Sequence, residues 1–340
     1  MRQIQWKSPS NIALVKYWGK YGVQLPSNPS ISFTLSECTT TTRLQWKDGR
    51  GKVSLRFNGE ENAAFGARAE KYIRSIESYL PHLKGFDLAI NSVNNFPHSA
   101  GIASSASAMS SLALCLCSLE QEISGVDIEE NDFFRKASFL ARLGSGSASR
   151  SVYGGFVSWG RAEQLKGSSD EYASPLPFEV HENFRELRNS ILIVDDGPKA
   201  VSSSQGHKLM NTHPYAAERF SLARDSLLNL LHALKNGDKN AFVRIVENEA
   251  LGLHGLMMSS EPGYILLKPG SLQIIEKIRH FRKDTGIMAC FTLDAGPNVH
   301  LIYPSREAEA VHKLIDRELL VYCKANHRID DHIGSGPQKI

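Results

Sequence analysis

The sequence has no apolar run that approaches the roughly 20 consecutive residues of a membrane-spanning helix. Residues 1–9 are polar, so we expect no secretory signal, whose apolar region is missing. The chain also lacks internal repeats, low-complexity tracts and any Lys/Arg cluster interleaved with aromatic residues. Its formal net charge of +3 is nearly balanced. We therefore expect neither a membrane span nor a nucleic-acid partner.

Cysteine is also scarce, and its spacing excludes the common zinc and redox motifs. The five residues are Cys38, Cys115, Cys117, Cys290 and Cys323. Their number is odd, they lie in apolar stretches, and the closest two are separated by a single residue. We therefore predict buried free thiols, which suit a reducing cytoplasm.

What the sequence does contain is enough apolar material for a large core. Hydrophobic residues make up 41% and charged residues 22% of the 340 residues, which describes a folded globular protein. This length accommodates one large domain or two domains of ordinary size.

The first half of the chain alternates predicted strands and helices. The predicted strands are 31–35, 39–46, 53–57, 86–93 and 152–159. The DGRG stretch at 48–51 predicts a hairpin between the second and third of these strands. Apolar spacing predicts one helix over 65–80 that ends at Pro81, one that runs through Leu119, and one over 131–143.

The second half begins after a polar, irregular stretch over 161–187. A buried strand at 190–194 restarts regular structure, so we predict an N-terminal domain over 1–188 and a C-terminal domain over 189–340. The elements predicted to follow are helices at 214–235, 238–254, 270–283 and 306–319, and strands at 288–293, 299–303 and 320–323. This order predicts an α+β second domain with a split βαβ arrangement.

A loop of small residues, FPHSAGIASSAS over 96–107, lies between a predicted strand and a predicted helix. Gly101 lets the backbone approach an anion, and the helix that follows presents unpaired N–H groups and the positive end of its dipole. Ser104, Ser105 and Ser107 add hydroxyl donors or a magnesium contact. No Gly-Lys-Ser/Thr follows, so this is not a Walker loop. A tight turn with serine caps is the alternative interpretation.

A second cluster of small polar residues, GSGSASRS over 144–151, follows a predicted helix. Backbone amides, hydroxyls and the Arg150 guanidinium suit a carboxylate or a phosphate, because arginine can pair with two oxygens at once. The alternative is a glycine cap of the helix followed by a flexible connector.

Near the N-terminus, the stretch NIALVKYWGK over 11–20 combines two lysines with two aromatic residues. In an extended segment Lys16, Trp18 and Lys20 share one face and Tyr17 points to the other, unless the backbone bends at Gly19. The lysines can neutralise phosphate charge, and the Tyr17 hydroxyl can donate a hydrogen bond. An exposed strand with solvated lysines is the alternative interpretation.

Asp294 stands at the end of an apolar strand, in FTLDAGPN over 291–298. One interpretation is a turn residue whose carboxylate bonds to its own backbone. The other is a general base in a cleft between two domains, where pockets are common. An aspartate base needs a nearby cation to stay ionised, and Lys16 would be such a partner.

Together these segments resemble diphosphomevalonate decarboxylases, which belong to the galactokinase, homoserine kinase, mevalonate kinase and phosphomevalonate kinase superfamily. The matching stretches, in family order, are 11–20, 94–97, 144–150 and 294–298, and the match extends to the tail at 334–337. The resemblance implies an α+β, two-domain small-molecule kinase fold. The N-terminal domain would resemble ribosomal protein S5 domain 2, the C-terminal domain would be ferredoxin-like, and ATP and substrate would bind between them.

The resemblance also implies roles for single residues. Asp294 matches the catalytic aspartate that interacts with the tertiary hydroxyl of the substrate, Lys16 the lysine beside it, and Arg150 the arginine that holds the substrate carboxylate. The positions that match the substrate site are Tyr17, Trp18, Gly19, Lys20, Arg68, Ser145, Gly146, Ser147, Ala148, Ser149, Arg150 and Ser204. The positions that match the ATP-phosphate loop are Ser99, Ala100, Gly101, Ala103, Ser104, Ser105 and Ser107, with Ser105 as the expected Mg²⁺ contact.

The implied activity is ATP-dependent decarboxylation of (R)-5-diphosphomevalonate to isopentenyl diphosphate in the mevalonate pathway, with ATP and Mg²⁺ as cofactors. A homodimer is also expected from the family. Two alternatives stay open, a decarboxylase of the monophosphate and a catalytically silent ATP-binding regulator on the same fold. Tyr17, Lys20, Arg68 and Ser204 supply enough donors for a diphosphate, which favours the first activity.

Overall fold

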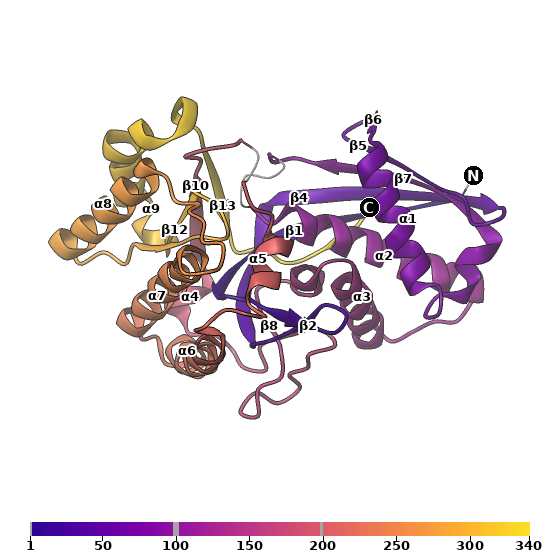
Figure 1. The fold of residues 1–340 in the computed structure, drawn as a ribbon, viewed down its shortest axis with the longest axis horizontal. Coiled ribbons are helices and arrows are strands. Elements are labelled where there is room, and N and C mark those ends of the chain that lie inside the picture. Colours follow the sequence, from indigo (N-terminus) through magenta and orange to yellow (C-terminus); the bar gives the residue numbers. More distant parts are fainter. Residues whose placement is uncertain (1, 98–101, 198–199) are drawn as a thin grey trace.

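The computed structural model describes residues 2–97, 102–197 and 200–340. Two main β-sheets, each covered by helices, make up the two sides of the molecule (Figure 1). This architecture confirms the α+β class expected from the sequence. Within these described ranges, no helix is both long enough and apolar enough to cross a membrane.

The first sheet is built on two long antiparallel strands, β1 (Arg2–Val15) and β4 (Ser30–Asp48). The other strands of this sheet are β5 (Val53–Phe57), β6 (Glu60–Glu61), β7 (Phe86–Asn94), β8 (Phe156–Trp159), β9 (Ser174–Pro175) and β14 (Gln338–Lys339). β4 merges the predicted strands 31–35 and 39–46, since both stretches are rich in threonine and other β-branched or aromatic residues. A separate ribbon pairs β2 (Lys20–Tyr21) with β3 (Leu25–Pro26).

The hairpin predicted at 48–51 is wrong. β7 lies between β4 and β5, antiparallel to the first and parallel to the second. The turn after β4 is held from β7 instead, because Asp87 Oδ1 accepts the backbone N–H groups of Arg50 and Lys52, each at 3.0 Å. A Gly-containing turn is set by local sequence, whereas the strand that completes the ladder is chosen by tertiary packing.

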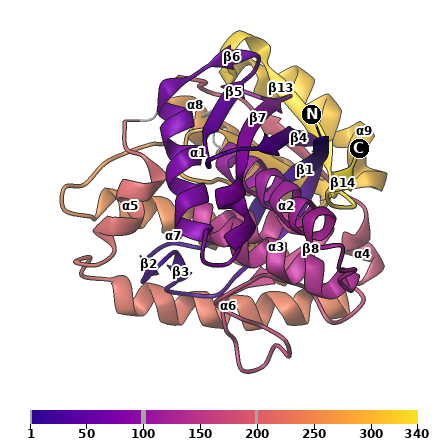
Figure 2. The ribbon, with the colours of Figure 1, turned by 90° about the vertical axis from the view of Figure 1, so that its right-hand side faces the viewer.

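Three helices cover one face of this sheet, α1 (Ala63–Ile76), α2 (Ser104–Ser124) and α3 (Glu130–Gly144) (Figure 2). α2 approaches the strands through small side chains, and Ser8 of β1 donates to Ser110 at 2.6 Å. α1 ends four residues before the predicted end at 80. The backbone before Pro81 is restricted, and a 3₁₀ turn, η1 (Pro81–Gly85), follows.

The second sheet has the order β11–β12–β10–β13 and is antiparallel throughout. Its strands are β10 (Leu187–Leu192), β11 (Cys290–Thr292), β12 (Val299–Pro304) and β13 (Arg328–His332). β10, the first of these strands along the chain, lies between β12 and β13. Helices connect β10 to β11 and β12 to β13. This is the split βαβ arrangement predicted for the second domain.

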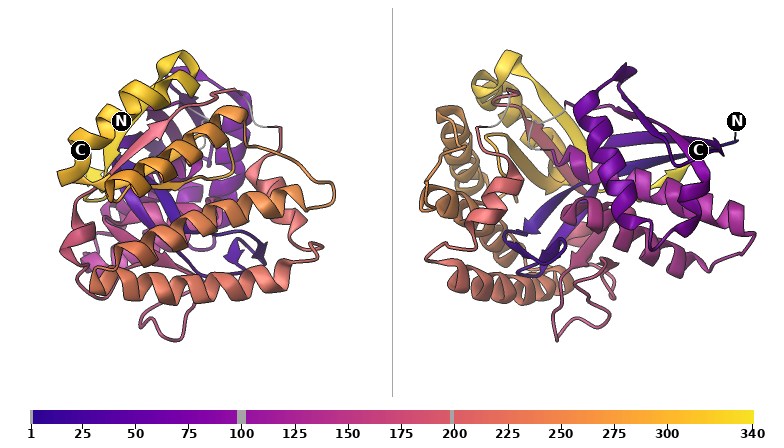
Figure 3. Two further views of the ribbon diagram at one scale, coloured as in Figure 1. Left: turned by 90° about the vertical axis from the view of Figure 1, so that its left-hand side faces the viewer. Right: turned by 45° about the vertical axis from the view of Figure 1, so that its right-hand side comes forward.

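Helices cover this second sheet, and α6, α7 and α8 lie in successive rows in the left view of Figure 3. The α-helices of this part are α4 (Glu182–Arg185), α5 (Ser203–Leu209), α6 (Ala216–Asn236), α7 (Lys239–Met258), α8 (Pro269–Thr285) and α9 (Ala308–Leu314). The shorter turns are η2 (Gly146–Val152), η3 (Ser305–Glu307), the π-turn η4 (Ile315–Leu319), η5 (Leu320–Tyr322) and η6 (Lys324–Asn326).

The last predicted strand, 320–323, is wrong, because that stretch forms the 3₁₀ turn η5 and Val321 is exposed. Ala325 and Asn326 then take positive φ angles of 50° and 54°, which turn the chain into β13. The sequence of β13 is RIDDH, which carries a single apolar residue and therefore gives no strand signal.

One apolar core connects the two sheets. It includes Ile12 and Phe33 from the first sheet, Ile191 and Ile302 from the second, and Leu227 from α6. The chain also ends on the first sheet, where β14 pairs with β1. The domain division at 188/189 stays a prediction, and the packing makes the two halves one continuous body at this core.

Asp331 of β13 binds the segment of β4 where the pairing with β1 is irregular, and its replacement tests how the two sheets are joined. Its buried carboxylate accepts the backbone N–H groups of Ser36, Glu37 and Cys38 at 2.8, 2.9 and 2.8 Å. Asp331→Asn removes the charge and one acceptor oxygen, so we expect the free energy of unfolding to fall by about 1.5–3 kcal/mol in urea titrations. Glu37→Gln, an exposed control, should change it by less than about 0.5 kcal/mol. Equal losses in both variants would contradict this account.

Candidate active site

Lys16 and Asp294, predicted as partners, form an ion pair. Lys16 follows the end of β1 and Asp294 follows β11, and Lys16 Nζ lies 2.9 Å from Asp294 Oδ1. The ammonium also donates to the carbonyl of Ala13 at 2.5 Å. The lysine side chain is 2% exposed and the aspartate side chain 25% exposed. The carboxylate therefore faces solvent while its cation is enclosed.

Burial governs the electrostatics of this lysine. It lowers the pKa of Lys16, while the charges of Asp294 and Glu249 act in the opposite direction and the positive charge of Arg150 adds to the lowering. A buried ammonium is favoured only where a carboxylate lies close to it. The position of the Asp294 carboxylate is thus coupled to the protonation of Lys16.

Arg150 lies in η2 and is buried, with its guanidinium fixed by two polar side chains. Nε and Nη2 each donate to Asn11 Oδ1 at 3.2 Å, and Nη1 donates to Ser30 Oγ at 2.8 Å. The guanidinium carbon lies 5.8 Å from the ring centroid of Trp159. Burial lowers the pKa of Arg150 to about 10, and the negative charge of Asp294 opposes this shift. The guanidinium stays charged at neutral pH in a rigid setting.

The predicted small-residue cradle over 144–151 packs closely against the same centre. A Cβ on Gly146 would come within 2.7 Å of the Trp159 ring and 2.8 Å of the Tyr17 hydroxyl, so only glycine fits there. Ser145 and Ser147 are partly exposed, whereas Ala148 and Ser149 are buried. The Ser149 hydroxyl donates to the Gly146 carbonyl at 2.8 Å, so it serves the cradle itself.

The cradle also meets the predicted phosphate loop, since Ser105 Oγ lies 3.4 Å from Ser145 Oγ. α2 begins at Ser104. The residue before it, Ala103, has a positive φ of 46°, and its side chain provides no cap for the first turn. Ser105 is exposed, while the Ser107 hydroxyl is buried 2.6 Å from Thr40 Oγ1. The predicted positions Ser99, Ala100 and Gly101 lie outside the described residues.

The alternation expected for an extended segment over 16–20 does not occur, because β1 ends at Val15 and Gly19, the position where a bend was the alternative, takes a positive φ of 96°. The rings of Tyr17 and Trp18 both contact the ring of His207 in α5, with centroid distances of 4.4 and 4.5 Å. The backbone N–H of Gly19 donates to His207 Nδ1 at 3.0 Å. Burial, then the charges of Lys20 and Arg150, lower the pKa of His207 to about 3, so the ring is neutral.

The remaining predicted substrate positions lie at the edge of this group. Lys20 is partly buried, which lowers its pKa, and its Nζ donates to Gln24 Oε1 at 3.0 Å. Ser204 is exposed in the first turn of α5, and Arg68 is exposed on α1 with its guanidinium carbon 6.0 Å from the Phe65 ring centroid. Among the described residues, no observed contact joins Arg68 or Ser204 to the Lys16–Asp294 pair.

Three residues at this centre were not identified from the sequence. Asn11 was part of a motif, but its amide connects Arg150 to the cradle by donating to Ser147 O at 3.1 Å and Ser151 Oγ at 2.8 Å. His207 is the single histidine of α5 and His254 that of α7, and the Asp294 carbonyl lies 3.1 Å from His254 Nε2. No spacing pattern distinguishes them from histidines that only pack in a core.

Comparisons with known proteins match both halves of the chain that contribute to this site. Residues 8–173 match the Diphosphomevalonate decarboxylase-like N-terminal domain, and residues 190–336 match the Mevalonate 5-diphosphate decarboxylase C-terminal domain. The diphosphomevalonate decarboxylase of Gibberella zeae is 31% identical over 325 residues, which cover 89% of this chain and 81% of that protein.

Solved structures agree with these matches. The crystal structure of mevalonate diphosphate decarboxylase from Staphylococcus aureus superposes with a TM-score of 0.85 at 29% identity, covering 100% of this chain and 98% of that one. The structure of MDDEF in complex with MVAPP, AMPPCP and magnesium superposes with a TM-score of 0.84 at 28% identity, covering 99% and 98%. The two-domain kinase-like fold expected from the sequence is thereby confirmed, and the chain belongs to the diphosphomevalonate decarboxylase family.

Proposed function

We propose that this chain converts (R)-5-diphosphomevalonate and ATP to isopentenyl diphosphate, ADP, phosphate and carbon dioxide, with Asp294, Lys16 and Arg150 as its catalytic residues. The observation that carries the assignment of these residues is the Lys16–Asp294 ion pair, formed by residues 278 positions apart. Its carboxylate is partly open to solvent, and the buried, charged Arg150 lies near enough to influence both groups. These observations support Asp294 as a base and Arg150 as a carboxylate-binding cation of the same site.

The first chemical step needs a group that orients or deprotonates the 3-hydroxyl of the substrate. Asp294 is the proposed group, and the Lys16 ammonium 2.9 Å away stabilises the negative charge of its carboxylate. The hydroxyl oxygen would then take the γ-phosphoryl group of ATP. Such transfers depend mainly on alignment and on charge neutralisation, which a fixed ion pair supplies without reorganisation.

The second step breaks two bonds. As phosphate leaves, the C3–O bond breaks and positive character develops at C3. The C1–C2 bond then breaks, its electron pair forms the C2–C3 double bond, and C1 leaves as carbon dioxide. Arg150 would hold the substrate carboxylate in the orientation that this elimination requires, because its guanidinium is fixed by Asn11 and Ser30.

The residues at the start of α2 fit the phosphates of ATP. Ala103 provides no side-chain cap at the start of α2, and the positive end of the helix dipole there favours an anion, to which Ser104 and Ser105 add hydroxyl groups. Mg²⁺ would neutralise charge on the phosphate oxygens, and we propose Ser105 as its protein contact. Among the described residues, no cluster of three or more His, Cys, Asp or Glu side chains could hold a metal ion. The AMPPCP and magnesium of the MDDEF complex support ATP and Mg²⁺ as the cofactors.

The 5-diphosphate of the substrate would bind to donors at the edge of the same region. The proposed substrate positions are Tyr17, Trp18, Gly19, Lys20, Arg68, Ser145, Gly146, Ser147, Ala148, Ser149 and Ser204. Burial raises the pKa of Tyr17, so its hydroxyl keeps its proton and can donate. Of the exposed members, Arg68 and Ser204 would contact the substrate only at the outer end of its diphosphate.

We further propose a cytoplasmic homodimer. The five cysteines are all buried free thiols, as expected in a reducing compartment. Burial raises the pKa of Cys115 to about 12 and that of Cys323 to about 11, so these thiols are unreactive at neutral pH. The homodimer rests on the family resemblance alone.

Asp294→Asn tests the proposed base. The amide keeps the size of the side chain but cannot accept a proton, so we expect kcat to fall by about 10²–10⁴-fold while the substrate still binds. Carbon dioxide release and isothermal titration with the substrate measure the two effects. Asp316→Asn, an exposed carboxylate after α9, is the control and should keep normal turnover. Near-normal turnover of Asp294→Asn would contradict the role of Asp294.

The phosphate count of the substrate is tested with the unmodified protein. We expect carbon dioxide and phosphate release from mevalonate diphosphate with MgATP, and none from the monophosphate. Release from the monophosphate alone would reassign the substrate. The absence of carbon dioxide from both would instead support a regulator on the same fold.

A further inference from the structure

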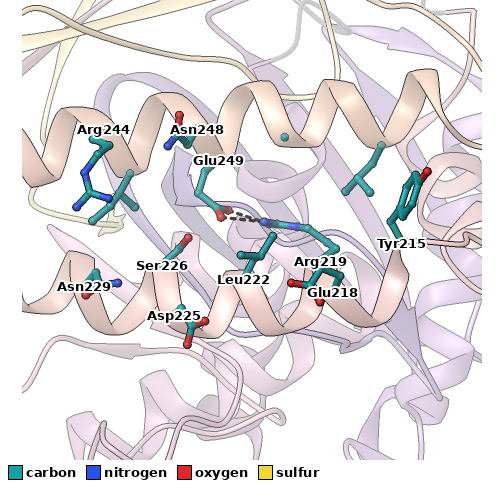
Figure 4. Close-up of a pocket in the computed structure, with 13 residues that line it drawn as sticks. Tyr215, Glu218, Arg219, Leu222, Asp225, Ser226, Asn229, Arg244, Asn248 and Glu249 are labelled. Carbon is teal, nitrogen blue, oxygen red and sulfur yellow. Dashed lines mark hydrogen bonds and ion pairs between the residues drawn. The ribbon is translucent and has the colours of Figure 1, made fainter.

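An ion pair is buried between α6 and α7 (Figure 4), and it also holds the backbone of Lys16 on both sides. Arg219 of α6 donates to Glu249 of α7 through two nitrogens, at 2.8 and 2.7 Å, and the side chains point toward each other between the helices. Glu249 Oε2 accepts the backbone N–H of Lys16 at 2.8 Å. Arg219 Nη2 donates to the Lys16 carbonyl at 2.8 Å. The pair therefore binds both peptide groups that flank the Lys16 side chain.

These contacts matter because Lys16 lies just beyond the sheet. β1 ends at Val15, so no strand partner aligns the backbone at the next residue. The Asn28 amide adds a second donor to the Lys16 carbonyl, at 2.9 Å. The direction of a side chain follows from its backbone, so a backbone held at N–H and carbonyl fixes where the ammonium can reach.

α7 also contacts the other member of the catalytic pair. His254, five residues after Glu249 on this helix, lies with Nε2 3.1 Å from the carbonyl of Asp294. One helix thus touches Lys16 through Glu249 and Asp294 through His254. The separation between the ammonium and the carboxylate is set by groups that belong to a single rigid element.

The charges around Lys16 complete this environment. The carboxylates that face it are Asp294 and Glu249, and both raise its pKa against the effect of burial. The cations are Arg150, which lowers its pKa, and Arg219 at its carbonyl. The Cys290 thiol is also a neighbour, and burial raises its pKa well above the usual value, so it is neutral. Glu249 is therefore a second negative charge for the catalytic lysine.

We propose that Arg219 and Glu249 are positioning residues for the decarboxylation, which act by fixing the backbone and the charge of Lys16. The proposal rests on the catalytic roles proposed above for Lys16 and Asp294. It assigns no contact with substrate to either residue. The Arg219–Glu249 pair would hold the Lys16 ammonium at its 2.9 Å contact with the Asp294 carboxylate, beside the substrate hydroxyl.

The surroundings of the pair make substitutions practical. Arg219 and Glu249 line a cavity of about 470 Å³ between α6 and α7, and Lys16 is not among its lining residues. Side chains of changed shape can adjust into this space without overpacking. The same helix also provides a matched control, because Glu247 is equally buried and pairs with Arg282 at 2.7 Å. The observed side-chain contacts of Glu247 are with Arg279 and Arg282, not with Lys16.

The test compares Glu249→Gln with Glu247→Gln in the full-length protein. Both lose a buried charge from α7, so both should lower the melting temperature. Only Glu249→Gln should lower kcat per folded molecule, by about 10- to 100-fold, because a misplaced catalytic group costs this much. It should also lower the pKa of Lys16, so activity should fall at a lower pH on the alkaline side. A structural defect alone would reduce the folded fraction and leave the pH profile unchanged.

Arg219→Lys is the second variant, and it keeps the charge but not the two-nitrogen contact. We expect an intermediate kcat with a smaller shift of the pH profile, and this variant decides the matter if Glu249→Gln does not fold. Normal kcat and pH profile per folded molecule in the folded variant would overturn the positioning role. If that result is obtained while Asp294→Asn is inactive in the same assays, only the positioning role of Arg219 and Glu249 fails. If that result is obtained and Asp294→Asn is also active, the catalytic roles proposed for Lys16 and Asp294 fail as well.

Discussion

The contact between Lys16 and Asp294 joins the ends of two strands that belong to different sheets. Each residue lies just after its strand, so neither is held by ladder hydrogen bonds. The contact at 2.9 Å therefore depends on how the two sheets are packed together. A core that runs from Ile12 to Ile302, and the return of β14 to β1, keep that packing in place. The geometry of the proposed catalytic pair is a product of the interface between the two halves of the chain.

The charges at this interface are arranged before any substrate arrives. Lys16 and Arg150 are buried cations, and the pKa of each is lowered by burial. Neighbouring carboxylates and side-chain acceptors compensate this cost, among them Asp294 for both cations and Asn11 for the arginine. A site that holds its dipoles and charges in fixed positions needs little reorganisation when charge develops on a substrate. The packing that buries the Lys16 and Arg150 cations thus also fixes their positions.

The sequence predicted the helices in which apolar residues recur with the helical period. The positions of α6, α7 and α8 follow from apolar spacing along each helix, and their observed bounds differ from the predicted ones by a few residues. The hairpin at 48–51 and the strand at 320–323 were wrong, because pairing partners are set by tertiary packing. β13 gave no signal, since its residues are mainly charged.

The residues of the candidate site likewise divide into those that the sequence predicted and those that it did not. Lys16, Arg150 and Asp294 were found because each lies in a short motif and the motifs occur in family order. Glu249 and Arg219 were not found, because a charged residue on a helix normally lies on its solvated face. Their role depends on a backbone contact more than 200 positions away in the sequence, which no local pattern encodes.

A double-mutant cycle tests the central claim, that Lys16 and Asp294 act as one unit. The rate of carbon dioxide release is measured for Lys16→Met, for Asp294→Asn and for the variant with both changes. If the ion pair is the functional element, the double variant should be no more than about threefold slower than the slower single variant. Two losses that multiply in the double variant would show that the residues act independently and would contradict this account.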